Sequence, residues 1–146
     1  MTVRDASTRW TGDLQTGSGI TTLDSSGTAQ FAVTFPQRIG EPEGTTSPEE
    51  LIAAAHSACF SMALSGGLGR AGTPPTSLTV SAEVEIDRVD GGLQITAVRL
   101  TVDGVVPGMN QAEFAAAAAE AKVGCPVSKA LAGVPSITVE ATLLPA

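Results

Sequence analysis

The sequence is short of aromatic residues, which make up 3% of its 146 residues, and it has no tyrosine. A core of mainly small side chains buries little area per residue, and each Å² of apolar surface contributes only roughly 25 cal/mol. Association with a second copy would bury more surface, so the composition favours an oligomer. The hydrophobic share of 42% is that of a folded globular chain and excludes a disordered one.

Positive charge is also scarce: the formal net charge is −7, and no cluster of Lys or Arg occurs. Such a chain cannot neutralise a phosphate backbone, so we expect no nucleic-acid partner. The first ten residues lack the basic start and apolar run of a signal peptide. The apolar stretch 51–68 is interrupted by His56, serines and glycines, unlike a membrane span. We therefore expect a cytoplasmic protein that does not contact a membrane.

The order of sequence patterns predicts one α+β domain, residues 1–146, with the element order βββ-α-ββ-α-α-β. The expected elements are short strands in 8–17, 20–25 and 30–35, a long helix to about 68, strands 77–89 and 93–106, a helix 110–123, a short helix from Pro126 and a strand 137–144. Asp90-Gly91-Gly92 supplies the turn of a hairpin. Residues 37–46 hold glycines and a proline, so they should form a loop that carries Arg38.

The long helix has a clear start. Ser47 can cap it, Pro48 suits its first position, and Glu49 and Glu50 favour its positive end. We expect it to be mostly buried and to stop at Gly66-Gly67 or Gly69.

The chain has two cysteines, with neither CxxC spacing nor a zinc pattern. Two buried structural thiols would be the ordinary interpretation. Cys125 precedes Pro126 at the start of a helix, where unpaired N–H groups stabilise a thiolate. Cys59 lies within the long helix, where burial would raise its pKa unless a cation is supplied from elsewhere. Arg38 is the candidate cation, although a lone loop arginine is more often simply solvated.

Glu49 could hold Arg38 through a bidentate pair. On one straight helix, however, Glu49 and Cys59 would lie about 15 Å apart along the axis. A cluster of all three residues would then have to be completed across a subunit boundary, unless only the guanidinium reaches Cys59. Taken singly, Glu49 and Glu50 could merely favour the helix dipole.

His56, the only histidine, lies three residues before Cys59 and on the same helix face. A Cys–His nucleophile and a metal site are both conceivable, but the sequence offers neither an oxyanion-hole motif nor enough metal ligands. A buried, hydrogen-bonded histidine is the better expectation.

Two long motifs in register are similar to those of the OsmC (osmotically inducible protein C) family, relatives of the organic hydroperoxide resistance proteins. They are TTSPEELIAAAHSACFSMAL at 45–64 and AKVGCPVS at 121–128, with VPG at 106–108 between them and WTGDL at 10–14 before them. The resemblance implies an intertwined homodimer with an antiparallel sheet, long central helices and both active sites at the dimer interface. His56 and the position of Arg38 make the chain resemble the OsmC subgroup.

The resemblance also implies a function, that of a thiol-dependent peroxidase of oxidative and osmotic stress. By position, Cys59 resembles the peroxidatic cysteine, Cys125 the resolving one, Arg38 the family arginine and Glu49 the family glutamate. No flavin, haem or metal is implied, but an external dithiol, of the lipoyl type, must reduce the resulting disulfide. The apolar surroundings of Cys59 favour organic hydroperoxides over hydrogen peroxide.

Two other functions fit the same residues. One is a non-catalytic stress protein that binds a small hydrophobic ligand at the dimer interface. Such a protein would consume peroxide only stoichiometrically, and no dithiol would regenerate its thiols. The other is a Cys–His hydrolase, for which Cys125 would be dispensable.

Overall fold

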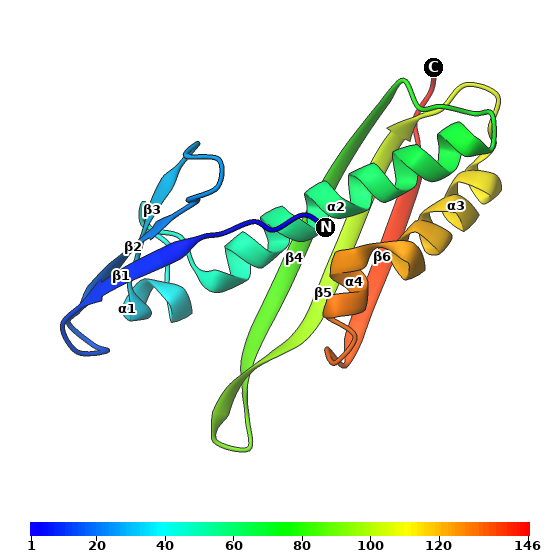
Figure 1. The fold of residues 1–146 in the computed structure, drawn as a ribbon. Coiled ribbons are helices and arrows are strands. Elements are labelled where there is room, and N and C mark those ends of the chain that lie inside the picture. Colours follow the sequence, from blue (N-terminus) through cyan, green and yellow to red (C-terminus); the bar gives the residue numbers. More distant parts are fainter. The chain divides into compact units, whose positions relative to one another are not determined.

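The computed structural model describes residues 1–146, which form two compact units, Met1–Leu51 and Ile52–Ala146 (Figure 1). We call them the N-terminal and the C-terminal unit and describe each by itself. The division falls within the long helix α2 (Pro48–Arg70).

The N-terminal unit contains a small antiparallel sheet. Its strands are β1 (Ser7–Thr11), β2 (Ser18–Thr22) and β3 (Gln30–Val33), and they lie in the order β1-β2-β3. The first strand is shorter than the predicted segment 8–17. Asp13 ends it, because its Oδ1 atom accepts hydrogen bonds from the backbone N–H groups of Gln15 and Thr16, each at 2.8 Å, and so closes a turn.

A short helix, α1 (Phe35–Ile39), follows β3 and carries Arg38 in its last turn. The prediction of a loop over 37–46 was therefore wrong for its first residues. Thr34 caps this helix by accepting a hydrogen bond from the Gln37 backbone N–H at 3.4 Å, and Pro36 lies at its start. These capping residues precede the glycines and the proline on which the loop prediction rested.

Helix α2 begins as predicted, with the Glu50 backbone N–H donating to Ser47 Oγ at 3.1 Å. It does not stop at Gly66, Gly67 or Gly69 but continues to Arg70. Buried packing of Leu68 outweighs the cost of about 1 kcal/mol that a helical glycine carries. The helix ends where Gly72 adopts a φ of 82° and the Thr73 N–H reaches back to the Leu68 carbonyl.

The prediction that α2 is mostly buried was also wrong. Within the C-terminal unit its buried side chains form one stripe: His56, Phe60, Leu64 and Leu68. The opposite face is exposed and carries small or apolar residues such as Ala58 and Met62. The helix is long and apolar enough to cross a membrane, but the buried stripe packs in the core of this unit.

The C-terminal unit is built on a second three-stranded sheet, in the order β4-β5-β6. Strands β4 (Ser77–Val89) and β5 (Gly92–Val105) form the predicted hairpin. Asp90 and Gly91 at its turn have φ values of 50° and 82°, the two positive angles of a type I′ turn.

Strand β6 (Ser136–Leu143) pairs with β5 in parallel, so the sheet is mixed and the expected antiparallel sheet was wrong at this edge. A parallel neighbour needs a crossover connection, and α3 (Gln111–Gly124) with α4 (Pro126–Ala130) provides it. The short helix from Pro126 was predicted.

The core of the C-terminal unit lies between one face of the sheet and the helices. Figure 1 shows α3, α4 and the later part of α2 over the same sheet. Phe60 of α2 and Phe114 of α3 are fully buried there, and Phe114 fits against Gly104 of β5, where any side chain would collide with the ring. The other face of the sheet is polar and carries, for example, the Glu85–Arg99 ion pair at 2.6 Å.

Candidate active site

The two cysteines lie together in the C-terminal unit, although they are far apart in the sequence. Cys59 is half-buried in the middle of α2 and packs against the core cluster to which the fully buried Cys125 belongs. Both thiols are free. Cys125 is the N-cap residue of α4, with Pro126 as the first residue of the helix. This placement gives a pair of thiols held by two separate helices.

The surroundings of the two sulfur atoms differ. Burial raises the pKa of the Cys59 thiol; the Val127 backbone N–H opposes this shift, and the neighbouring Cys125 adds to it. Burial alone would also raise the pKa of Cys125, but the backbone N–H and the hydroxyl of Ser128, together with Cys59 and Val127, hold it below its ordinary value. The helix start thus favours the Cys125 thiolate, as its sequence position predicted. Cys59 gains no cation from its own unit.

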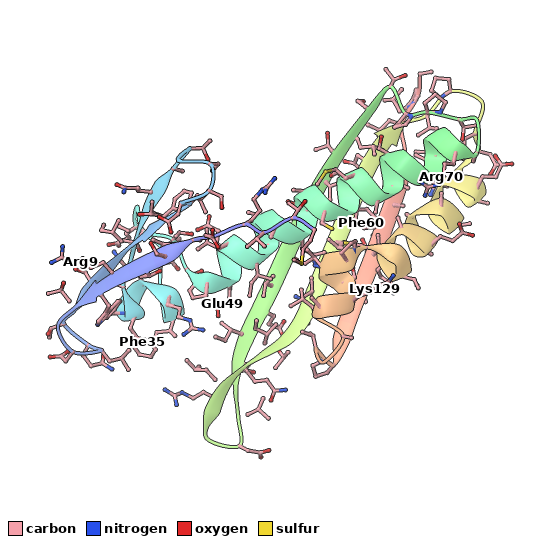
Figure 2. All side chains as sticks on the ribbon, viewed as in Figure 1. Arg9, Phe35, Glu49, Phe60, Arg70 and Lys129 are labelled. Carbon is pink, nitrogen blue, oxygen red and sulfur yellow. The ribbon has the colours of Figure 1, made fainter.

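Arg38 and Glu49 form a close ion pair within the N-terminal unit, where Figure 2 marks Glu49 at the start of α2. Arg38 Nη2 donates to Glu49 Oε1 at 2.7 Å, and Arg38 Nε donates to Oε2 at 3.1 Å. Hydrogen bonding to Glu49 raises the pKa of Arg38 further, so the guanidinium stays charged. The predicted arginine–glutamate pair is therefore formed. It belongs to one unit and the cysteine pair to the other.

An apolar cavity of about 360 Å³ adjoins Arg38 in the N-terminal unit. Its apolar lining includes Trp10, Leu14, Val33 and Phe35. A permanent cation on a mostly apolar wall, which also includes three threonines, suits a ligand with one polar end and a hydrocarbon body.

His56 is completely buried, and its Nε2 lies 2.7 Å from the hydroxyl oxygen of Ser128. The expectation of a buried, hydrogen-bonded histidine is confirmed. Nε2 faces Ser128 and Nδ1 has no partner, so His56 makes no hydrogen bond to Cys59. A Cys–His hydrolase would need that hydrogen bond. No group of three or more His, Cys, Asp or Glu side chains lies close enough to hold a metal ion.

Ser128 was not predicted as a site residue. It lies three positions after Cys125, just as His56 lies three before Cys59, and this symmetry of spacing was the available signal.

Comparison with known proteins gives one consistent family. Residues 40–140 match the model of the family described as OsmC-like protein. Over 122 residues the chain is 46% identical to peroxiredoxin OsmC of Escherichia coli (strain K12), which covers 84% of this chain and 85% of that protein. It is 33% identical over 100 residues to the organic hydroperoxide resistance protein of Xanthomonas axonopodis pv. citri, covering 67% of this chain and 68% of that protein.

Solved structures agree with the fold. The organic hydroperoxide resistance protein OhrB of Bacillus subtilis superposes with a TM-score of 0.72 at 25% identity, over 96% of this chain and 98% of that chain. An organic hydroperoxide resistance protein of Elizabethkingia anophelis, crystallised with thiocyanate bound, gives a TM-score of 0.72 at 29% identity, over 99% of each chain.

Proposed function

The chain belongs to the OsmC-like protein family, and from this membership we propose that it is a thiol-dependent peroxidase that reduces organic hydroperoxides with Cys59 and Cys125. The observation that carries the proposal is the meeting of the two free cysteines within the C-terminal unit. The relative at 46% identity is named a peroxiredoxin, and a second relative is an organic hydroperoxide resistance protein.

The reaction has two steps. The Cys59 thiolate attacks one oxygen of the O–O bond, an S–O bond forms, and the other oxygen leaves as an alcohol after taking up a proton. The sulfenic acid on Cys59 then condenses with Cys125, forming the disulfide and releasing water. The family's relatives use cysteine chemistry, and the cycle needs electrons from an external dithiol, for which a lipoyl-type carrier is our proposal.

Cys59 takes the peroxidatic role because it is the more accessible thiol, half-buried against the fully buried Cys125. Its raised pKa has to be lowered before it can react at neutral pH. Arg38, held by Glu49, is the cation proposed for this purpose, and it would also bind the peroxide oxygens. In this proposal the Arg38–Glu49 pair of one subunit serves the cysteines of the other subunit in a homodimer.

Two surface features support a homodimer. The exposed face of α2 in the C-terminal unit carries Ala58 and Met62, and Met62 is 69% exposed. Beside it, a groove of about 480 Å³ is lined by residues of α2 and α3, including Gly66, Gly67 and Ala117. Small residues allow another helix to approach closely, and a second copy would cover this apolar surface.

The apolar cavity next to Arg38 favours an organic peroxide over hydrogen peroxide, because it can hold a hydrocarbon body beside the cation. We further propose that the protein acts in the cytoplasm, where a reduced dithiol is available.

Single-turnover consumption of cumene hydroperoxide and hydrogen peroxide, with thiols counted before and after, tests the function. Wild type should lose both thiols and react faster with the organic peroxide, whereas Cys59→Ser should consume neither. Survival of peroxide in all samples would contradict the proposal and favour the ligand-binding protein. Ester hydrolysis retained in Cys125→Ser would favour the hydrolase.

A further inference from the structure

Two pairs of side chains join α2 to α4 side by side in the C-terminal unit. On α2, His56 and Cys59 are three residues apart, and on the segment that starts α4, Cys125 and Ser128 are also three apart. Residues at this spacing share a helix face. His56 Nε2 lies 2.7 Å from Ser128 Oγ, and Cys59 and Cys125 are neighbours that influence each other's titration. Figure 2 marks Phe60 and Lys129, which immediately follow Cys59 and Ser128 on the two helices.

The His56–Ser128 hydrogen bond lies in the core. His56 is fully buried and Ser128 is 7% exposed. The bond pairs His56 Nε2 with the Ser128 hydroxyl, two polar groups that would be costly to leave without a partner in an apolar core. Helix α4 has only five residues, so it depends on such contacts for a fixed position. The hydrogen bond therefore fixes the register in which Cys125 faces Cys59.

The direction of the hydrogen bonds follows from counting protons. Ser128 has one hydroxyl proton to donate. If the Ser128 hydroxyl donates its hydrogen bond to the sulfur of Cys125, then His56 Nε2 must be protonated and donate a hydrogen bond to Ser128 Oγ. In this tautomer Nδ1 is a bare acceptor, which agrees with its lack of any donor or acceptor partner. In the other tautomer the proton would be on Nδ1, and this N–H group would have no acceptor in the core.

We propose that His56 and Ser128 are positioning residues for the second step of the peroxidase reaction, in which they align Cys125 with Cys59 and direct a relayed hydrogen bond to the Cys125 thiolate. This inference rests on the proposed function. In the step that they assist, the Cys125 thiolate attacks the sulfenic sulfur of Cys59, the S–S bond forms and the S–O bond breaks. Cys125 is oxidised, the sulfenic sulfur is reduced, and hydroxide leaves and takes a proton from solvent.

Other charged groups do not explain the low pKa of Cys125. The ammonium group of Lys122 on α3 donates a hydrogen bond to the Ile137 carbonyl oxygen at 3.1 Å, and Lys129 of α4 is exposed. Burial by itself raises the pKa of Cys125, and the residues that lower it are Ser128, Cys59 and Val127, none of which has an acidic or basic side chain other than the Cys59 thiol itself. Burial accounts for the lowered pKa of His56. The hydroxyl of Ser128 is thus the side-chain donor that a substitution can remove.

The two steps of the reaction can be measured separately. Peroxide is mixed with reduced protein, sulfenic acid on Cys59 is trapped with dimedone, and disulfide formation is followed by mass spectrometry. In Ser128→Ala, disulfide formation should slow about tenfold relative to sulfenic acid formation, since the lost hydrogen bond is to a charged group. Ser128→Thr retains the hydroxyl and should recover most of this rate. Ser61→Ala, which removes a hydroxyl that bonds only to the Ser57 carbonyl of α2, is the matched control.

A second readout separates the relay from simple packing. In a Cys59→Ser background, the thiolate absorbance of Cys125 is titrated with pH in combination with Ser128→Ala, Ser128→Thr and His56→Gln. The pKa of Cys125 should rise in Ser128→Ala and stay low in Ser128→Thr. The disulfide of the otherwise intact Ser128→Ala protein should also become harder to reduce, because the reduced state loses its stabilised thiolate.

The outcomes distinguish this inference from the proposed function. If wild type formed no sulfenic acid on Cys59 after mixing with peroxide, the proposed peroxidase function itself would be refuted. Normal sulfenic acid formation, with the same disulfide rate and the same Cys125 pKa in Ser128→Ala as in wild type, would refute only the relay. Equal slowing in Ser128→Ala and Ser128→Thr would refute the relay as well, since the hydroxyl would then have no effect of its own.

Discussion

Glu49→Gln should be far more damaging than the same change one position later, at Glu50. The Glu49 carboxylate is 7% exposed and receives three short contacts from the Arg38 guanidinium, at 2.7, 3.1 and 3.3 Å. Glu50 is exposed, and its side chain accepts a hydrogen bond only from Thr46 Oγ1. The two residues therefore form a matched pair with the same chemistry in different surroundings.

The size of the effect follows from burial. A hydrogen bond to a charged group contributes about 1.5–3 kcal/mol, whereas an exposed ion pair contributes about 1 kcal/mol at most. The Arg38 side chain is 31% exposed, which allows solvent to screen the pair. Glutamine can still accept one hydrogen bond. We therefore expect Glu49→Gln to lose about 1–2.5 kcal/mol of unfolding free energy and Glu50→Gln about 0.5 kcal/mol.

Denaturant unfolding followed by Trp10 fluorescence measures this difference. Trp10 is the only tryptophan, and it lies in the same unit as Arg38 and Glu49. Because about 1.4 kcal/mol corresponds to a factor of ten, the peroxide-reduction rate of Glu49→Gln should also fall about tenfold if the carboxylate holds the activating arginine. Indistinguishable unfolding curves and rates for the two variants would refute this reasoning.

Three further changes test the fold and its pH dependence. Gly104→Ala places a methyl group against the Phe114 ring, with Cε2 at 2.9 Å, so thermal melting should report a loss of about 1–3 kcal/mol, which Phe114→Leu should partly restore. Asn110→Ala removes the side-chain cap of α3, which accepts a hydrogen bond from the Glu113 backbone N–H at 3.0 Å. Urea unfolding should show a loss of about 1 kcal/mol of unfolding free energy, and an unchanged midpoint would contradict this expectation. Burial lowers the pKa of His56, so the unfolded chain takes up a proton first as the pH falls. The contribution of His56 to stability should be constant above about pH 6.5 and decline below it by up to about 1.4 kcal/mol per pH unit, a slope that His56→Gln should lack.

Local features of the structure were predictable from the sequence because they depend on neighbouring residues. The Ser47 cap of α2, the turn at Asp90-Gly91 and the helix start at Cys125-Pro126 each follow from the preferences of a few adjacent side chains. The arginine–glutamate pair was a candidate from its residue types and was supported by the family resemblance, as were the cysteine motifs, and the ion pair is present.

Features that depend on distant contacts were not predictable in the same way. Strand β6 is parallel to β5 because of the path of the intervening helices, which alternation cannot reveal. Helix α2 continues through its glycines because Leu68 packs in the core, and its opposite face carries exposed residues such as Met62 that its own unit leaves uncovered. The role of Ser128 needed the contact with His56 on another helix.

Peptide mapping after one equivalent of cumene hydroperoxide tests the two-cysteine reaction most directly. Wild type should yield a single new cross-linked peptide pair joining Cys59 to Cys125, and Cys125→Ser should instead carry a dimedone adduct on Cys59. Recovery of both cysteines as free thiols, with the peroxide unconsumed, would contradict the assignment of this pair as the catalytic centre.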